Sequence, residues 1–242
     1  MQKRLFVLLI LAVVSIAISG SGPELGAGES MTTGPITFTA TVDPPVFDDL
    51  SDEEVAALVE ADREARASGR LPGFQRYSIE AASAALPGLW RPTYLPAAFE
   101  LTLGIVIAAP EVDDLREAGV AIDVADYQAP PPQLTVPGRN GGVLTITVSP
   151  IGTGQLQIPV APGSVRTVRF GAWQGTIVYG HWLVQLTADR NEVRRGWDPT
   201  GAKRLVFVRD GRLVEIDVMP ASAISDGELL RIAAGLRPAE EP

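Results

Sequence analysis

The second half of the chain alternates apolar and polar positions in the way that is typical of β-strands. After residue 142 it runs through VLTITVS, QLQIPV, SVRTVRFG, GTIVYG and WLVQLT, with glycine between most of them. The clearest pair of runs, RLVFVR and RLVEIDV, flanks Asp210 and Gly211. This dipeptide favours the two-residue turn of a β-hairpin. The pattern therefore predicts an antiparallel sheet.

Two further strands are expected nearer the N-terminus, at 36–42, where apolar residues alternate with threonine, and at 99–108. In the segment 110–142 the apolar and polar residues follow neither a helical nor a strand period. Its proline-rich part, 129–142, is predicted to be a loop. Because long structured loops are often functional, this segment is a weak site candidate. The simpler interpretation is an excursion between two strands.

Two helices are predicted before residue 90. The first spans 51–69, where Ser51 and Glu54 form a capping box and the apolar face is thin. We interpret it as a surface helix, with a partner-binding helix as the alternative. The second spans 78–86 and is ended by Pro87.

The last predicted element is a helix that begins at Ser225, which forms a capping box with Glu228, and ends near Gly235. Its broad apolar side must lie on the sheet. That side consists of Leu229, Leu230, Ile232, Ala233 and Leu236. The expected fold class is therefore α+β, with a single curved antiparallel sheet and helices packed on one face.

The stretch LWRPTYLPAAF, residues 89–99, is predicted to be a packed elbow. Its two prolines fix φ and exclude both a regular helix and a central strand. An irregular segment of this kind needs large side chains to hold it against the core. Trp90, Tyr94 and Phe99 are expected to serve that purpose.

Residues 1–20 have the layout of a secretory signal peptide. Lys3 and Arg4 precede a 14-residue run, 5–18, that is apolar except for Ser15, and small residues follow. The run is shorter than the roughly 20 apolar residues of a membrane span. We therefore expect an exported protein, extracellular or tethered on the extracytoplasmic side. The segment is either cleaved or retained as an anchor.

The predicted organisation has five parts. A signal peptide or anchor at 1–20 is followed by a flexible linker at 21–35 and by an N-terminal strand and surface helix at 36–74. A sheet-and-helix extracytoplasmic domain then spans 75–237, and a tail spans 238–242.

The composition narrows the classes of partner and cofactor. The 242-residue chain has a formal net charge of −9, whereas nucleic-acid-binding domains are usually basic, and this charge disfavours adsorption to anionic lipid. It has no cysteine and one histidine, so the usual ligand sets for zinc are absent. We expect no nucleic acid, no metal and no cofactor, and membrane contact only through the N-terminal segment.

Few residues form a pattern that indicates catalysis or metal binding. The sole histidine, His181, begins a predicted strand, and no G-x-S-x-G motif accompanies it. The acidic clusters at 48–54 and 111–114 lack the spacing of a calcium-binding loop. We assign no catalytic residue and predict that the protein is not an enzyme, with a secreted hydrolase as the third alternative.

One basic and aromatic patch lies in a predicted hairpin. The simpler interpretation is a solvated loop, and the alternative is contact with an anion or a partner protein, because arginine binds carboxylate and phosphate well. The candidate residues for that contact are Arg190, Arg194, Arg195 and Trp197.

Six aromatic residues flank or occupy predicted strands, and we expect most of them in the core. If some line the concave face under the C-terminal helix, that face would hold an apolar ligand. These candidates for a ligand groove are Trp90, Tyr94, Phe99, Trp173, Tyr179 and Trp182.

Two end motifs resemble an uncharacterised family of bacterial extracytoplasmic domains. In that family a short S-x-E-A-A helix precedes a P-x-Y-L-P elbow and an aromatic residue, and the domain ends on a strand hairpin and an S-x-E-E-L-L-R-I-A helix. The matching residues here are Ser78, Glu80, Pro92, Tyr94, Leu95, Pro96 and Phe99, then Val206–Val218, then Ser225, Glu228, Leu229, Leu230, Arg231, Ile232 and Ala233. The resemblance covers roughly residues 75–237.

The resemblance implies a domain outside the membrane, of the kind found on anti-sigma factors, sporulation proteins and lipoproteins. It also implies an architecture similar to the sigma-E-regulator and lipoprotein-carrier fold, a half-barrel sheet with helices on its concave side. The family has no set of catalytic residues that would carry over to this chain.

Together these observations favour an exported, non-enzymatic binding or sensing module of the cell envelope. It would engage an apolar ligand, such as a lipid, or an envelope protein in a groove between sheet and helix. The alternative is a ligand-free structural or interaction domain tethered at the outer, membrane-facing surface. The first predicts an apolar cavity between the C-terminal helix and the sheet, and the second predicts a filled core with an exposed apolar patch.

Overall fold

The computed structural model describes residues 25–42, 75–86, 88–109, 131–151, 156–186 and 193–239. Predictions for the signal segment, the helix at 51–69 and most of the 110–142 segment lie outside the described residues. Within them the chain is mostly β, with two α-helices.

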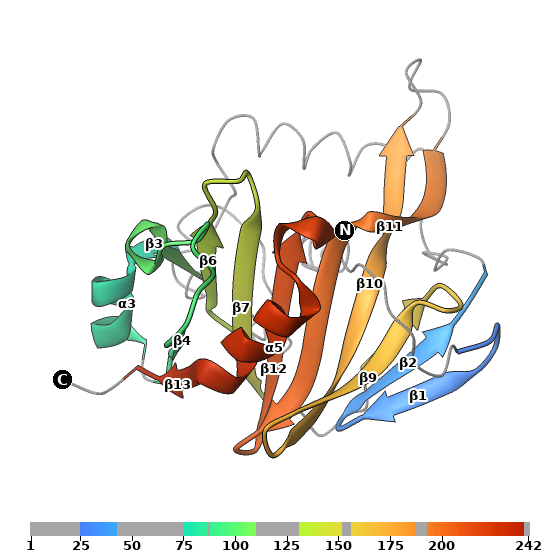
Figure 1. Cartoon of the computed structure of the whole chain (residues 1–242), viewed down its shortest axis with the longest axis horizontal. Helices are drawn as coiled ribbons and strands as arrows, with labels where there is room; N and C mark the ends of the chain where they lie inside the picture. Colours follow the sequence, from blue (N-terminus) through green and yellow to red (C-terminus); the bar gives the residue numbers. More distant parts are fainter. Residues whose placement is uncertain are drawn as a thin grey trace, which may run out of the picture.

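An open eight-stranded antiparallel sheet forms the centre of the structure (Figure 1). The prediction of an antiparallel sheet is thus confirmed. From one edge to the other its strands are β3 (Gln75–Ser78), β5 (Ile105–Ala108), β6 (Gln133–Pro137), β7 (Val143–Pro150), β12 (Arg212–Met219), β11 (Val193–Arg209), β10 (Trp173–Leu186) and β9 (Val165–Phe170).

One face of this sheet is covered by both helices. The α3 helix (Ile79–Ala85) and the α5 helix (Asp226–Gly235, red in Figure 1) bury residues in one hydrophobic cluster with inward-facing residues of β7, β11 and β12. A two-stranded sheet of β4 (Trp90–Pro92) and β13 (Leu236–Pro238) completes this layer. The prediction that helices pack on one face is confirmed for the described helices.

The opposite face carries a second sheet, so the prediction of a single sheet was wrong. In it β2 (Ile36–Ala40) pairs with β1 (Ser30–Thr33) and, in parallel, with β8 (Leu156–Val160). The physical reason lies in β9, β10 and β11, which bury apolar side chains on both faces. On the face toward the second sheet these side chains include Val165, Val178 and Val206.

The local turn and cap signals are confirmed. Asp210 and Gly211 both have positive φ, 52° and 69°, and they close the hairpin of β11 and β12. The Ser225 side chain accepts the Glu228 N–H, and the Glu228 carboxylate accepts the Ser225 N–H, as a capping box requires. Ser78 caps α3 in the same manner by accepting the N–H of Ala81.

Two predictions about the middle of the chain were wrong. The proline-rich segment 129–142 is not wholly a loop, because β6 lies within it and pairs with both β5 and β7. Its prolines fall at or beyond the ends of the strand, and the side chains of Leu134 and Val136 are fully buried. The predicted strand at 99–108 is interrupted by a 3₁₀ turn, η1 (Leu101–Leu103).

The elbow is packed as predicted at two of its three aromatic residues. Trp90 and Phe99 are buried in the hydrophobic cluster under the helices. Tyr94 is half-buried, and its ring stacks on the guanidinium of Arg231 in α5, 3.8 Å from the ring centroid. The elbow and α5 are further joined by the Thr93 N–H and hydroxyl, which both donate to the carbonyl of Gly235 at 3.0 and 2.8 Å.

Candidate functional site

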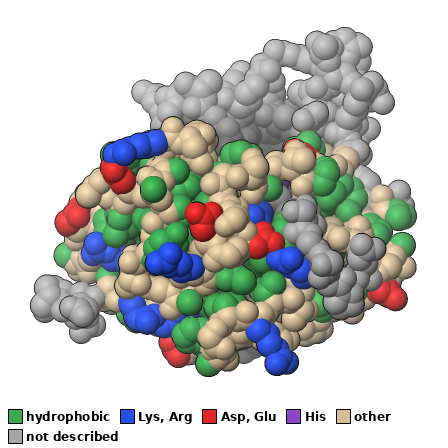
Figure 2. Space-filling model, in the orientation of Figure 1, with side chains coloured by type: hydrophobic (Ala, Val, Ile, Leu, Met, Phe, Trp, Pro, Cys, Tyr) green, Lys and Arg blue, Asp and Glu red, His purple; other side chains and the backbone are tan. Residues whose placement is uncertain are grey.

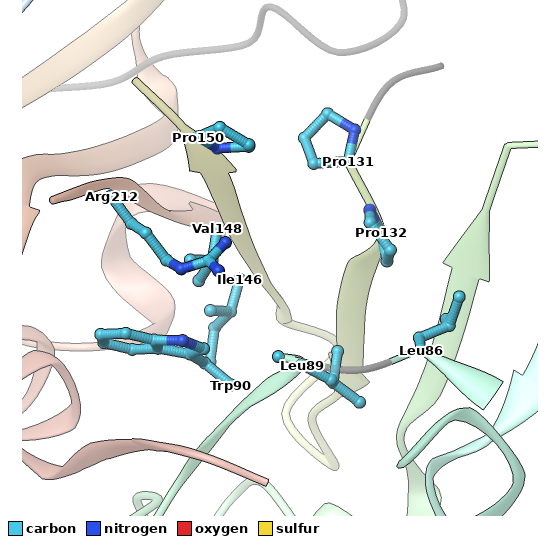
Figure 3. Close-up of a pocket in the computed structure, with 10 residues that line it drawn as sticks. Leu86, Leu89, Trp90, Pro131, Pro132, Ile146, Val148, Pro150 and Arg212 are labelled. Atoms are coloured by element: carbon cyan, nitrogen blue, oxygen red, sulfur yellow. The ribbon is translucent and has the colours of Figure 1, made fainter. Parts of the chain in front are cut away.

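A cavity of about 200 Å³ opens on the helix-bearing face of the large sheet, beside β4 (Figure 3). It is smaller than the roughly 300–1,000 Å³ of sites for drug-sized ligands. We call it the β7–β12 cavity. Its lining residues are Leu86, Gly88, Leu89, Trp90, Pro131, Pro132, Ile146, Val148, Pro150 and Arg212.

The floor of the cavity follows from strand alternation. Side chains two residues apart share one face of a strand, so Ile146, Val148 and Pro150 of β7 all point to the helix-bearing side. Arg212 is the register partner of Pro150 on the adjacent strand β12. The floor is therefore apolar along β7 and ends in one cation.

One wall consists of Leu86, Gly88, Leu89 and Trp90, between α3 and the elbow, and we call it the Leu86–Trp90 wall. Its backbone is held at both ends: the Leu89 N–H donates to the Leu86 carbonyl at 3.3 Å, and the Ala239 N–H donates to the Leu89 carbonyl at 2.5 Å. Gly88 has a φ of +82°, a conformation that glycine adopts without strain. The opposite wall is formed by Pro131 and Pro132, just before β6 (Figure 3).

The cavity is chemically simple. Apart from Arg212, its side chains are apolar or absent, so hydrocarbon can be buried against them. The general surface around it is mixed in charge: among the described residues on this face, basic and acidic side chains are interspersed with hydrophobic ones (Figure 2).

Of the six aromatic groove candidates, the structure brings only Trp90 to this cavity. Phe99, Trp173 and Tyr179 belong to the hydrophobic cluster between the sheet and the helices, where α5 itself is packed through buried side chains. Tyr94 packs on the edge of that cluster. The predicted cavity between the C-terminal helix and the sheet is therefore not found among the described residues: buried side chains fill that interface, and the cavity lies next to it.

Trp182 lies apart from the other candidates, on the extension of β10 beyond the sheet centre. Its indole packs edge-on against Trp197 with ring centroids 5.2 Å apart, and its Nε1–H donates to the Pro159 carbonyl at 3.2 Å. Trp197 was a candidate for partner contact. The backbones of Arg194 and Arg195 pair with β10 next to it, while the side chains of these two residues and all of Arg190 lie outside what the structure describes.

His181 is buried opposite Asp198, its register partner across β10 and β11. Burial lowers the pKa of His181, although the nearby Asp198 carboxylate acts in the other direction. The imidazole Nδ1 is buried without a hydrogen-bond partner. The Asp198 carboxylate accepts both the N–H and the hydroxyl of Thr200 at 2.8 Å, so that hydroxyl is not directed at the imidazole. His181 is thus buried and Asp198 is only partly buried, and within the described residues no serine or threonine hydroxyl is shown to be hydrogen-bonded to the imidazole.

A second polar cluster fixes the beginning of α5 to the sheet. The Asp226 carboxylate accepts hydrogen bonds from Tyr179, from Arg166 and, at 2.9 Å, from the Lys203 ammonium group. Lys203 also donates to the Ile224 carbonyl at 2.6 Å.

The contacts in this cluster shift the pKa of two of its groups. Burial and the hydrogen bond to Asp226 raise the pKa of Tyr179. Burial alone would raise the pKa of Asp226, but its donors and the two cations hold it below the ordinary value. The cluster is a structural anchor, because Tyr179, Arg166 and Lys203 all donate to the one carboxylate of Asp226 at the start of α5.

A pair of carboxylates lies on the other face of the large sheet. Glu215 and Asp217 flank one residue of β12, and both are ion-paired to the buried guanidinium of Arg204, at 3.1 and 2.6 Å. Burial raises the pKa of Asp217 to about 6, Arg204 opposes the rise, and Glu215 adds to it. In the part of the chain that the structure describes, no three metal-ligating side chains gather in one place.

Sequence reasoning missed Arg212 as a site residue, although a signal was present. The residues of β12 that point to the helix-bearing side are Val214, Ile216 and Val218, all buried. Arg212 continues that series by two residues and breaks its apolar character. A cation at an inward-facing strand position is the feature that could have drawn attention to it.

Comparisons with protein families, curated proteins and solved structures found no match for this chain. Among the described residues there is no helix with the length and apolar character needed to cross a membrane.

Proposed function

We propose that this protein is an exported, non-enzymatic binding or sensing module of the cell envelope that holds the apolar part of a small ligand in the β7–β12 cavity. The observation that carries the proposal is the cavity itself, in which an apolar floor and two apolar walls converge on a single charged side chain. Binding sites for small molecules are usually apolar pockets that contain a small number of positioned polar groups.

The packing around the cavity supports a preformed site. Trp90 and Ile146 are both buried members of the main hydrophobic cluster, so the floor and one wall are fixed by the core of the domain. Binding then costs little ordering of side chains, and the free energy of desolvating the ligand contributes directly to affinity.

The envelope location rests on the N-terminal sequence. Residues 1–20 have the charge and hydropathy pattern of an export signal, and the end motifs resemble those of extracytoplasmic domains. Such a domain meets lipids and their fragments, which is the class of compound that an apolar cavity selects.

Native mass spectrometry of the exported protein tests this proposal. We expect a bound small molecule that leaves on denaturation and is recovered by organic extraction. The variant Val148→Phe fills the cavity floor and should lose this species, whereas Val143→Phe, a matched change at an exposed position of the same strand, should retain it. A clean mass for the wild type, combined with no binding of added 1-octanol or octanoate, would overturn the proposal.

A ligand-free interaction domain is the second candidate, and one observation favours it. Val143 of β7 and Met219 of β12 are register partners, and they are 37% and 42% exposed on the side of the sheet away from the cavity. If this small patch is the functional surface, Met219→Asp should abolish capture of an envelope protein, whereas the cavity-filling variant Val148→Phe should leave that capture unchanged. Equal capture by the variant and the wild type would remove this candidate.

A further inference from the structure

The side chain of Arg212 enters the β7–β12 cavity from a position that is otherwise used for core residues. Its neighbours on the same face of β12 are Val214 and Ile216, which are fully buried. Figure 3 shows its guanidinium group between Trp90 and Val148, directed into the cavity. A Cβ atom placed on Gly88 would lie 3.7 Å from a terminal nitrogen of Arg212, so the guanidinium lies against the Leu86–Trp90 wall.

Within the described residues, Arg212 has no hydrogen-bond acceptor and no carboxylate partner. Arg209, which faces the same side of the sheet, has contacts inside the fold. This residue, the register partner of Arg212 across the hairpin, lies between the rings of Trp90 and Trp173, 5.0 and 4.4 Å from their centroids, and donates to the Ala233 carbonyl at 3.4 Å. Arg212 lacks such an arrangement, and its five N–H donors are available to a ligand.

A second arginine lies next to Arg212 on the neighbouring strand. Arg209 and Arg212 are opposite each other at the end of the hairpin. The carboxylate paired with Arg209 is that of Asp210, which is 68% exposed in the turn and 3.4 Å from the Arg209 Nε. Because its charge is well solvated, Asp210 neutralises little of the field inside the cavity.

We infer that the ligand of this cavity is a small amphiphilic carboxylate, whose alkyl chain lies on Ile146 and Val148 and whose carboxylate is bound by Arg212. This inference rests on the proposed function and names its ligand class. A planar guanidinium matches a carboxylate with two parallel hydrogen bonds, and the partly desolvated site strengthens them. A neutral hydroxyl would offer the guanidinium a single uncharged acceptor in place of two carboxylate oxygens, and the hydrogen bond would be weaker.

Isothermal titration of the exported protein with three probes of equal chain length tests the inference: octanoate, 1-octanol and octylammonium. We expect octanoate to bind about ten-fold more tightly than 1-octanol, as one charge-assisted hydrogen-bonded pair implies, and octylammonium to bind least. In Arg212→Gln the preference for octanoate over 1-octanol should disappear, with 1-octanol binding unchanged.

The control is Arg169→Gln, which removes an exposed arginine from the edge strand β9 and should leave the octanoate preference intact. Equal affinity of the wild type for octanoate and 1-octanol would overturn the inference while leaving the proposed function in place. Loss of the octanoate preference in Arg169→Gln as well would also overturn it, because the effect would then reflect net charge. Failure of all three probes to bind would overturn the inference and the proposed function together.

Discussion

The indole of Trp197 packs directly on the α-carbon of Gly180. The ring occupies the space in which the Cβ atom of any other residue at 180 would lie, and Gly180 itself has a φ of +114°. This contact coincides with an irregularity in the pairing of β10 and β11, between Tyr179 and His181. A glycine is therefore required at the point where the long hairpin leaves the centre of the sheet.

Substitution of this glycine should be strongly destabilising. We expect Gly180→Ala to lower the free energy of unfolding by about 3 kcal/mol, because the methyl group overlaps the Trp197 ring and the backbone conformation is unfavourable for alanine. Gly196→Ala on the facing strand is the matched control, since a methyl group there meets nothing within 4 Å. Urea denaturation of both variants measures the difference, and similar stabilities would refute the close contact.

The anchor at the start of α5 predicts a charge-dependent loss of stability. Asp226→Asn keeps the shape of the side chain but leaves the buried ammonium group of Lys203 without a counter-charge, so we expect a loss of about 3 kcal/mol. The double variant Lys203→Met with Asp226→Asn should recover part of this loss, because it removes the unpaired charge. A single variant as stable as the wild type in denaturant would show that the cluster does not fix α5.

Burial of His181 predicts a specific pH dependence. Its pKa is lowered from the ordinary 6.5, so the folded state binds fewer protons than the unfolded state below that pH. The stabilising contribution is therefore complete above about pH 6.5 and is lost as the pH falls toward the lower pKa of the folded protein. We expect the difference in unfolding free energy between the wild type and His181→Gln to shrink between about pH 7 and pH 5. A difference that is constant across this range would contradict the burial of a neutral imidazole.

The elbow predicts unequal roles for its aromatic residues. Phe99 is buried against Gly138 and Gly142, where a Cβ atom would approach its ring to 2.8 and 3.1 Å, so Phe99→Ala should cost about 3–5 kcal/mol. Tyr94 is half-buried and stacked on Arg231, and Tyr94→Ala should cost about 1–2 kcal/mol. Chemical denaturation of the two variants provides the comparison, and a larger loss for Tyr94→Ala would reverse the assignment.

Much of the architecture was predictable because local rules determine it. The Asp210–Gly211 turn sets the register of β11 and β12, and alternation then places Val214 and Ile216 on the buried side. The capping box of Ser225 and Glu228 located the start of α5. These signals act over a few residues, and tertiary contacts did not override them.

The features that sequence reasoning missed depend on distant segments. The parallel pairing of β2 with β8 joins Ile36 to Leu156, and no local pattern reports such a contact. Strand β6 was missed because prolines stand at and before its ends, where they favour a loop prediction but do not interrupt its pairing with β7. The β7–β12 cavity likewise combines the Leu86–Trp90 wall, two prolines before β6 and the adjacent strands β7 and β12. Beforehand, Trp90 was its one individually named candidate, and Pro131 and Pro132 lay in the 110–142 segment that was a weak site candidate.

Photo-crosslinking with an octanoic acid that carries a diazirine on its alkyl chain tests the central claim most directly. The account predicts that the label maps to residues 86–90 and 146–150, that unmodified octanoate competes for it, and that Val148→Phe removes it. Label spread over the surface, or concentrated around Trp182 and Trp197 and insensitive to Val148→Phe, would show that the β7–β12 cavity is not the ligand site.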